Sequence, residues 1–184
     1  MKKCLLLLFC FISIHTFSQE IATNEIDKFT KKLHIETSFE PLVIKDHLWS
    51  LSVIDNLWGE FKYIDNETFF IIKWCTGDNS IIDTGDNVLF LDKNGISYKL
   101  YNTSVRVSES DAGTVGQDVK RGELGVELYL TGDFKSIFEN GITDLRIYTN
   151  KGYVDFNIKK KESKRLKSLY ELFNETLNEE LEKQ

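Results

Sequence analysis

The residues best placed to do chemistry in this chain form a group of cations near its end. Six of the nine residues from Lys159 to Lys167 are lysine or arginine. Such a group attracts anions, which predicts a patch for anionic lipid headgroups or an acidic partner. The alternative is that these side chains are solvated or lie against the acidic body of the protein. The candidate patch residues are Lys160, Lys161, Lys164 and Arg165.

A second candidate binding element is the stretch Arg106–Gly122, which is the longest part of the chain without hydrophobic periodicity. It is rich in glycine, serine and charged residues. A stretch of this length without regular structure inside a compact domain is usually functional or disordered. We expect a partner-binding loop here, with the candidate contact residues Asp111, Gln117, Lys120 and Arg121.

Known catalytic patterns are missing from the sequence. Beyond residue 18 the chain has two histidines, His34 and His47, and one cysteine, Cys75, which we interpret as a small core residue. It contains no Gly-x-Ser-x-Gly elbow, His-Glu-x-x-His helix or Cys-x-x-Cys pair. We therefore expect no catalytic residues, no metal and no cofactor. Paired carboxylates could still form a hydrolase site in so acidic a chain.

Two other groups of residues have a structural explanation. Three aspartates gather in the polar loop 76–87, but their spacing does not match the helix–loop–helix calcium pattern, and such residues are common in turns. Three tryptophans could stack on sugar rings, although large aromatic residues in alternating strands are more often part of a core. The aspartates are Asp78, Asp83 and Asp86, and the tryptophans are Trp49, Trp58 and Trp74.

The N-terminus has the pattern of a secretory signal peptide over residues 1–18. Lys2 and Lys3 precede a short apolar run, and small residues stand at Thr16 and Ser18. The run is too short to span a bilayer, and Phe9 before Cys10 excludes a lipid-modified cysteine. We expect the mature chain to begin at the next residue and to be periplasmic or secreted, with no transmembrane segment after cleavage.

Length and charge indicate one soluble, acidic domain over residues 19–184. Loss of the two N-terminal lysines leaves 21 Lys and Arg against 29 Asp and Glu, so the net charge moves from −6 to −8. An acidic chain argues against a broad nucleic-acid surface. Because one cysteine remains, an internal disulfide is excluded, and packing must supply the stability.

The elements that must position these residues are mainly strands. Segment 68–75 is apolar on both faces, which predicts a central strand covered on both sides. Asn24–Lys32 fits either a helical face or a loop, and Pro41 is expected to close the strand before it. The expected strands are Leu33–Phe39, Leu48–Ile54, Trp58–Ile64, Thr68–Cys75, Val88–Asp92, Ile96–Asn102, Leu124–Leu130, Ile142–Thr149 and Tyr153–Lys159.

Two hairpins carry predicted registers. In the last one, a turn at Lys151-Gly152 would pair Thr149 with Val154, Ile147 with Phe156, and Leu145 with Ile158. In the other, a two-residue loop at Asn94-Gly95 would place Leu89 and Leu91 on the face of Tyr98 and Leu100. A three-residue loop with a glycine bulge would place Val88 and Phe90 there instead.

Two helices are expected. A short one follows Thr131 or Asp133 as its cap, buries Phe134, Ile137 and Phe138, and ends at Gly141. The long one runs from about Lys161 to Glu182, with an apolar stripe that should dock on the sheet. Its lysines come first and its glutamates last, which is the wrong polarity for the helix dipole. The fold expected is an antiparallel β-sandwich of eight or nine strands with these two helices, and the alternative is an up-and-down β-barrel.

Several segments together resemble small exported β-rich proteins of Bacteroidota that carry no assigned function. They are the signal ending Thr-Phe-Ser-Gln, Ile26-Asp-Lys-Phe-Thr-Lys-Lys, Phe90-Leu-Asp-Lys-Asn-Gly-Ile, and Ile142-Thr-Asp-Leu-Arg-Ile-Tyr-Thr-Asn-Lys-Gly-Tyr-Val-Asp-Phe. The resemblance implies an exported location and no particular activity.

We expect an exported module without catalytic activity that binds a protein or surface partner. A carrier of a small hydrophobic or sugar ligand is the first alternative, and a carboxylate-based hydrolase is the second.

Overall fold

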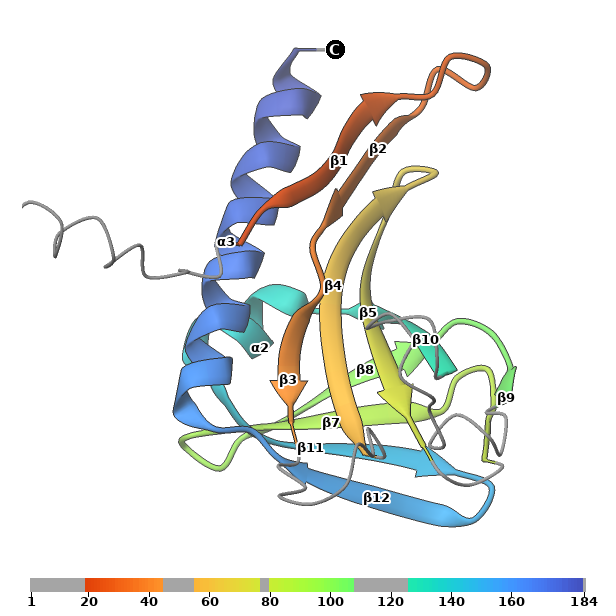
Figure 1. The fold of residues 1–184 in the computed structure, drawn as a ribbon, viewed down its shortest axis with the longest axis vertical. Helices are drawn as coiled ribbons and strands as arrows, with labels where there is room; N and C mark the ends of the chain where they lie inside the picture. The colour runs from red at the N-terminus through yellow and green to blue at the C-terminus, as the bar shows by residue number, and fades with distance from the viewer. Residues whose placement is uncertain (1–18, 45–54, 77–79, 108–125, 184) are drawn as a thin grey trace, which may run out of the picture.

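The computed structural model describes residues 19–44, 55–76, 80–107 and 126–183 (Figure 1). Ten strands form one antiparallel sheet, and two further strands form a small second sheet. Within these residues the strands are β1 (Ile21–Ile26), β2 (Leu33–Thr37), β3 (Glu40–Val43), β4 (Asn56–Ile64), β5 (Glu67–Cys75), β6 (Ile81–Ile82), β7 (Asn87–Asp92), β8 (Ser97–Asn102), β9 (Arg106–Val107), β10 (Val126–Gly132), β11 (Ile142–Thr149) and β12 (Gly152–Asn157). The helices are α2 (Phe134–Asn140) and α3 (Lys160–Glu182).

The large sheet bends so that the part containing β12 faces the part containing β5, as in a β-sandwich. Its strand order is β1-β2-β4-β5-β10-β8-β7-β11-β12, with β3 beside β4. Trp74 on β5 lies 5.8 Å, ring to ring, from Phe156 on β12, although these strands are far apart in the sheet. β1 and β12 do not pair in the described part of the chain, so the predicted sandwich is confirmed and the sheet does not close into a barrel. The predicted strand number was too low because β1, β3, β6 and β9 were not anticipated.

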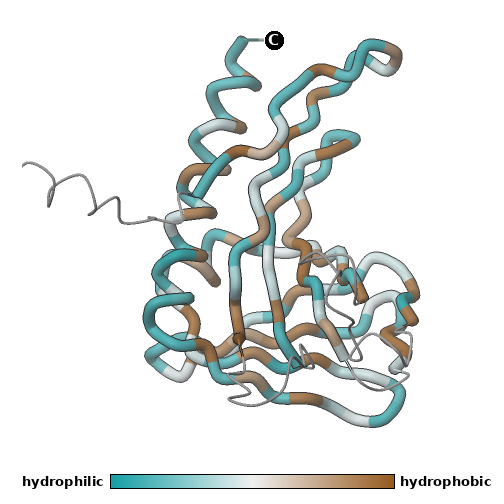
Figure 2. Tube along the Cα trace, viewed as in Figure 1, coloured by the Kyte–Doolittle hydropathy of each residue, from teal (hydrophilic) through white to brown (hydrophobic). Residues whose placement is uncertain are grey.

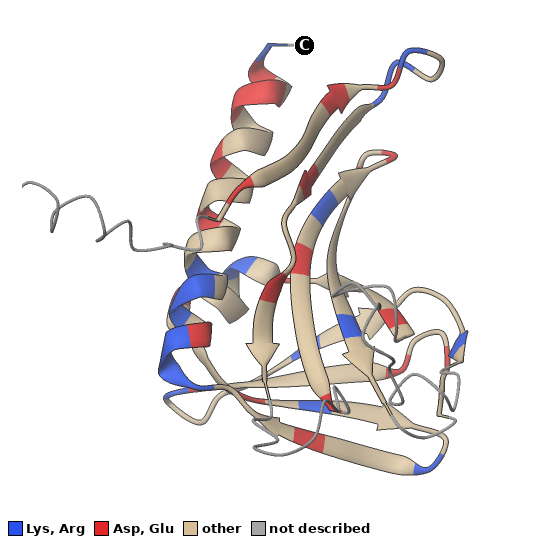
Figure 3. Ribbon diagram, viewed as in Figure 1, with Lys and Arg blue, Asp and Glu red and all other residues tan. Residues whose placement is uncertain are grey.

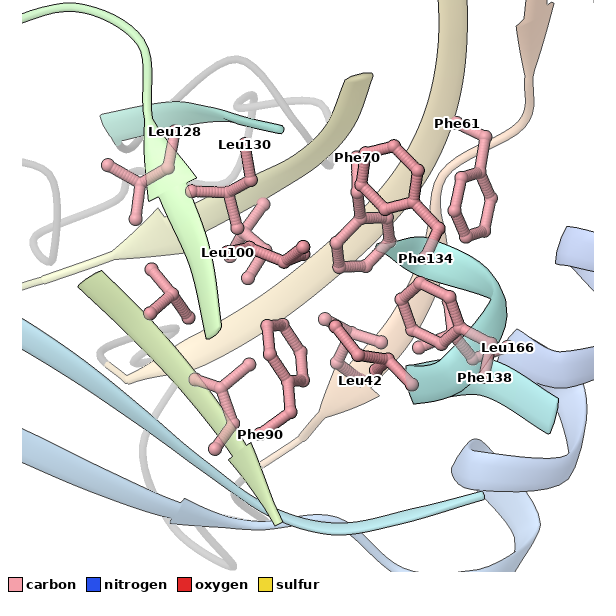
Figure 4. Packing of buried hydrophobic residues seen from close by; sticks show 14 of the residues in the cluster. Leu42, Phe61, Phe70, Phe90, Leu100, Leu128, Leu130, Phe134, Phe138 and Leu166 are labelled. Atoms are coloured by element: carbon pink, nitrogen blue, oxygen red, sulfur yellow. The ribbon is translucent and has the colours of Figure 1, made fainter. Parts of the chain in front are cut away.

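Aromatic rings fill the space between the layers and the helices (Figure 4). Phe61 on β4 lies 5.1 Å from Phe138 on α2 and 5.5 Å from Phe173 on α3. Phe70 on β5 lies 6.2 Å from Phe90 on β7. Burial of such side chains contributes most of the favourable free energy of folding.

The long helix α3 docks on the sheet as its apolar stripe predicts. Leu166, Leu169, Phe173 and Leu177 are buried, and α3 contacts β2, β3 and β4. Figure 2 shows hydrophobic and hydrophilic positions alternating along the helix and the strands. The docking fixes the first turns of α3 beside α2 and the start of β11.

The β7–β8 hairpin adopts the register with the glycine bulge. Val88 pairs with Leu100 and Phe90 with Tyr98. Gly95 has a φ of 80°, a backbone angle that residues with a side chain rarely adopt. The three-residue loop is favoured over the two-residue loop because it buries Val88 and Phe90 in the core.

The β11–β12 hairpin differs from prediction by two residues. Its pairs are Leu145 with Phe156, Ile147 with Val154, and Thr149 with Gly152. The turn is therefore Asn150-Lys151, and Gly152 follows it with a φ of 119°. Because side chains alternate with a period of two, this shift keeps the predicted sorting of faces while changing every pair.

At the N-terminal end the structure decides between two open alternatives and corrects one prediction. In the segment Asn24–Lys32 the loop alternative is confirmed for Asp27–Lys32, which is a turn leading into β2, while the three residues before it end β1, which pairs with β2. Pro41 lies inside β3 and pairs with Trp58, on an edge where its missing N–H is not needed. The predicted strand Leu48–Ile54 lies outside the described residues.

The short helix α2 has the predicted cap. The Asp133 carboxylate accepts a hydrogen bond from the Ser136 backbone N–H at 3.1 Å, and Phe134, Ile137 and Phe138 are buried. Gly141 follows the helix with a φ of 74° and a ψ of 140°, so its φ is positive but its conformation is not left-handed helical.

Candidate anion-binding cleft

A cleft of about 490 Å³ lies where α2 ends, β11 begins, the β7–β8 turn passes and α3 starts. We call it the lysine cleft, because four lysines and one carboxylate line it. Its apolar lining comes mainly from Ile142 and Ile158, which are buried. The charged lining residues are Lys93, Lys160, Lys164, Lys167 and Glu139.

Helical spacing and strand pairing together assemble the cleft. Lys160, Lys164 and Lys167 are separated by four and three residues along α3, so they share one helix face. Lys93 is distant in the sequence, and it reaches the cleft because the preceding residue, Asp92 of β7, pairs with Ile142 of β11.

Two hydrogen bonds hold the helix start in this position. The Ile142 N–H donates to the Ser163 hydroxyl oxygen at 2.9 Å, which joins β11 to α3. The Lys167 ammonium donates to the Glu139 carbonyl oxygen at 3.0 Å, which joins α3 to the end of α2. These two hydrogen bonds therefore fix the segments that carry the charged residues of the lining.

The cleft carries excess positive charge. Lys93, Lys160 and Lys164 make no ion pair within the described residues, while Lys167 lies 3.8 Å from Glu171 on its exposed side. Four lysines against one glutamate give the lining a formal charge of +3. Ammonium groups are compact point charges that donate in any direction, so this arrangement can bind a multivalent anion.

The structure divides the predicted basic patch. Lys160 and Lys164 line the cleft, while Lys161 is exposed and is not part of the lining. Arg165 lies on another side of α3, where its charge acts on Glu40 of β3. Burial raises the pKa of Glu40, and the nearby Arg165 partly opposes that rise. Of these four residues, Arg165 is the one whose charge acts on an acidic residue of the sheet in the described part of the chain.

The other sequence candidates contribute no site in the described residues. Asp111, Gln117, Lys120 and Arg121 lie outside the described part of the chain, as do Asp78 and Trp49. Asp83 and Asp86 form a turn, in which the Asp83 N–H donates to the Asp86 carboxylate at 2.8 Å. Trp58 and Trp74 are buried. No group of three or more His, Cys, Asp or Glu residues among those described could hold a metal ion.

Cys75 has the environment of a core residue. Its side chain is buried at the end of β5, and this burial raises the pKa of the thiol. A raised pKa disfavours the thiolate, which is the nucleophilic form of cysteine. The interpretation as a small core residue therefore agrees with its surroundings.

Sequence reasoning missed one member of the cleft and left another out of the candidate patch. Lys167 belongs to the predicted group of cations but was not among the four candidate residues, although it lies seven residues after Lys160 and so returns to the same face of α3. Lys93 gave no local signal, because its place depends on the pairing of β7 with β11.

A second charged group lies on the opposite face of β4 and β5 from the aromatic core. Glu60 is 2% exposed, and Lys62 lies 4.0 Å from its carboxylate and 3.0 Å from that of Glu36. Lys73 lies 3.1 Å from Glu127 on β10. Burial, reinforced by the negative charge of Glu36, raises the pKa of Glu60 to about 8. This carboxyl group is therefore mainly protonated at neutral pH.

No family model, curated protein or solved structure matches this chain. Among the described residues, neither helix has the length and apolar character needed to cross a membrane.

Proposed function

We propose that the protein is an exported binding module without catalytic activity, and that the lysine cleft receives an anionic group of its partner. One observation carries the proposal: three lysines without an ion pair among the described residues converge on a cleft of about 490 Å³. Binding clefts for small groups commonly have volumes of roughly 300–1,000 Å³.

The acidity of the whole chain makes this local charge informative. The protein carries a net charge of −6, yet the cleft lining carries +3. Figure 3 shows a group of basic residues at the start of α3 and on α2, further basic residues at the tip of the β1–β2 hairpin, and acidic residues toward the C-terminal end of α3. A positive cleft on a negative protein attracts anions at short range, and salt weakens that attraction.

The packed interior supports a surface site over an interior ligand. Phe61, Phe70, Phe90 and Phe138 contact one another between the layers. A carrier needs an enclosed space for its ligand, and these rings occupy the space that such a ligand would need.

Calorimetry with a simple polyanion tests the proposal. The protein would be expressed with its own leader, purified after export and titrated with inorganic tripolyphosphate at low salt. We expect binding by the wild type and its loss in the double variant Lys160→Gln, Lys164→Gln. The matched control is Lys99→Gln, Lys151→Gln, which removes two exposed lysines elsewhere. Equal binding by the wild type and both variants would refute the role of the cleft.

A further inference from the structure

An exposed apolar residue stands next to the lysine cleft. Ile96 ends the β7–β8 turn, is 51% exposed and lies three residues after Lys93. Its position is fixed, since the Asp92 N–H donates to the Ile96 carbonyl oxygen at 3.0 Å and the Ile96 N–H donates to the Asp92 carboxylate at 2.9 Å. The turn thus holds an apolar side chain in solvent beside a group of cations.

Charge is distributed so that this end of the molecule would face a negative surface. The exposed glutamates Glu171, Glu175, Glu179 and Glu182 lie toward the far end of α3. A rise of about 1.5 Å per residue places Glu182 roughly 33 Å along the helix from Lys160. An anionic surface attracts the basic end and repels the acidic end, so both effects favour one orientation (Figure 3).

We infer that the lysine cleft and the β7–β8 turn dock on an anionic phospholipid bilayer, with headgroup phosphates in the cleft and Ile96 in the interfacial layer. This inference rests on the proposed function, because it names the partner of the same cleft. Lysines near an anionic bilayer attract its headgroups, and exposed apolar side chains at such a site enter the boundary between headgroups and acyl chains.

The chemistry favours lipid phosphates over the carboxylates of a protein partner. Lysine lacks the planar fork with which arginine holds a carboxylate, and its point charge suits headgroups that have no fixed orientation. A lining charge of +3 needs several anionic groups close together, which the headgroups of an anionic bilayer supply. The exposed Ile96 then contacts the apolar boundary that a bilayer provides.

Vesicle sedimentation with the exported protein tests this inference. We expect binding to vesicles of phosphatidylglycerol and phosphatidylcholine, no binding to pure phosphatidylcholine, and weaker binding as salt rises. Each lysine near the surface accounts for about a fivefold change in affinity, so Lys160→Gln, Lys164→Gln should lose about 25-fold. Lys99→Gln, Lys151→Gln should bind like the wild type in this assay too.

A fluorescence experiment tests the contact of the turn with lipid. Ile96→Trp should be quenched by brominated phosphatidylglycerol vesicles, while Val105→Trp, at a residue of similar exposure (56%) outside the turn, should not. Each tryptophan signal is read as the difference from the wild type. Circular dichroism and thermal unfolding establish that every variant is folded.

The possible results separate the two proposals. Tripolyphosphate binding without vesicle binding would overturn the membrane inference and leave the anion cleft standing. Binding of an oligoglutamate peptide without vesicle binding would also overturn the membrane inference, and it would point to an acidic protein as the partner. Binding of none of these probes would overturn both. Vesicle binding that survives both the double variant and Ile96→Ser would place the lipid contact elsewhere and overturn the inference.

Discussion

Replacing Glu60 with glutamine should change how the stability of the protein depends on pH. Glu60 is buried on β4 between Lys62 and the neighbouring acids, and its pKa is raised from 4.5 to about 8. Glutamine has nearly the shape of a protonated glutamate and cannot ionise. The variant therefore tests whether this carboxyl group is held in its neutral form.

The direction of the effect follows from proton linkage. Between pH 4.5 and about 8 the folded state holds the Glu60 proton more tightly than the unfolded state, so unfolding releases a proton. The contribution to stability is complete below the unfolded pKa and is lost as pH rises through the folded pKa. The slope approaches 1.4 kcal/mol per pH unit, which gives an upper limit of roughly 5 kcal/mol over this range.

Urea denaturation of the wild type and Glu60→Gln at several pH values measures this difference. Near pH 5 the two proteins should differ by about 1 kcal/mol or less, since the wild-type side chain is then also neutral. At pH 9 the variant should be more stable by a few kcal/mol, up to the limit above. Glu67→Gln, at the exposed start of β5, is the matched control for replacing a glutamate by glutamine.

A constant free-energy difference between the wild type and Glu60→Gln from pH 5 to 9 would refute the reasoning. It would mean that Glu60 is ionised throughout this range, with Lys62 and Lys73 compensating for its burial. A variant that is less stable at pH 9 would lead to the same conclusion, because it would show a favourable role for the charged form.

Three further predictions concern packing, capping and export. Phe138→Ala should destabilise the protein by about 3–5 kcal/mol in urea denaturation, because the ring of Phe138 is buried against those of Phe61, Phe70 and Phe90. A denaturation midpoint near that of the wild type would contradict this packing. Asp133→Ala should cost about 1 kcal/mol by the same assay through loss of the α2 cap, with Asp133→Asn as the variant that keeps an acceptor. Protein isolated from the envelope or medium of its host should begin at Gln19 when its N-terminus is sequenced, and a start at Met1 would show that residues 1–18 are retained.

Local patterns in the sequence were enough to predict most elements of the fold. The alternation along β10 and the stripe on α3 each bury one face, so the period of apolar residues fixes both the element and its orientation. The β11–β12 hairpin shows that local patterns do not always determine which residues pair. Moving the turn by one residue shifts the pairing by two, and both pairings sort the side chains equally well, so the pattern alone cannot choose between Asn150-Lys151 and Lys151-Gly152.

Short strands and the site depended on contacts between distant residues. β3 contains Pro41, which local rules exclude from a strand, and it forms because β4 offers it an open edge. The lysine cleft likewise needs Lys93 and Lys160, which lie far apart in the sequence and meet through the pairing of β7 with β11. A single sequence indicates that cations cluster at the start of α3, but it does not indicate that a cleft forms there.

The positions of the lysines and glutamates along α3 indicate why lysines are present at the cleft. Lysines at the start of a helix and glutamates at its end oppose the helix dipole, at a cost of a few tenths of a kcal/mol for each exposed charge. Contact with the acidic body of the protein would offset that cost, and Arg165 gains it from Glu40. Lys160 and Lys164 gain no such contact within the described residues and instead line a cleft beside Lys93. Their charges therefore oppose folding slightly without compensation among those residues, which is the arrangement expected when the balancing anion is supplied by a partner.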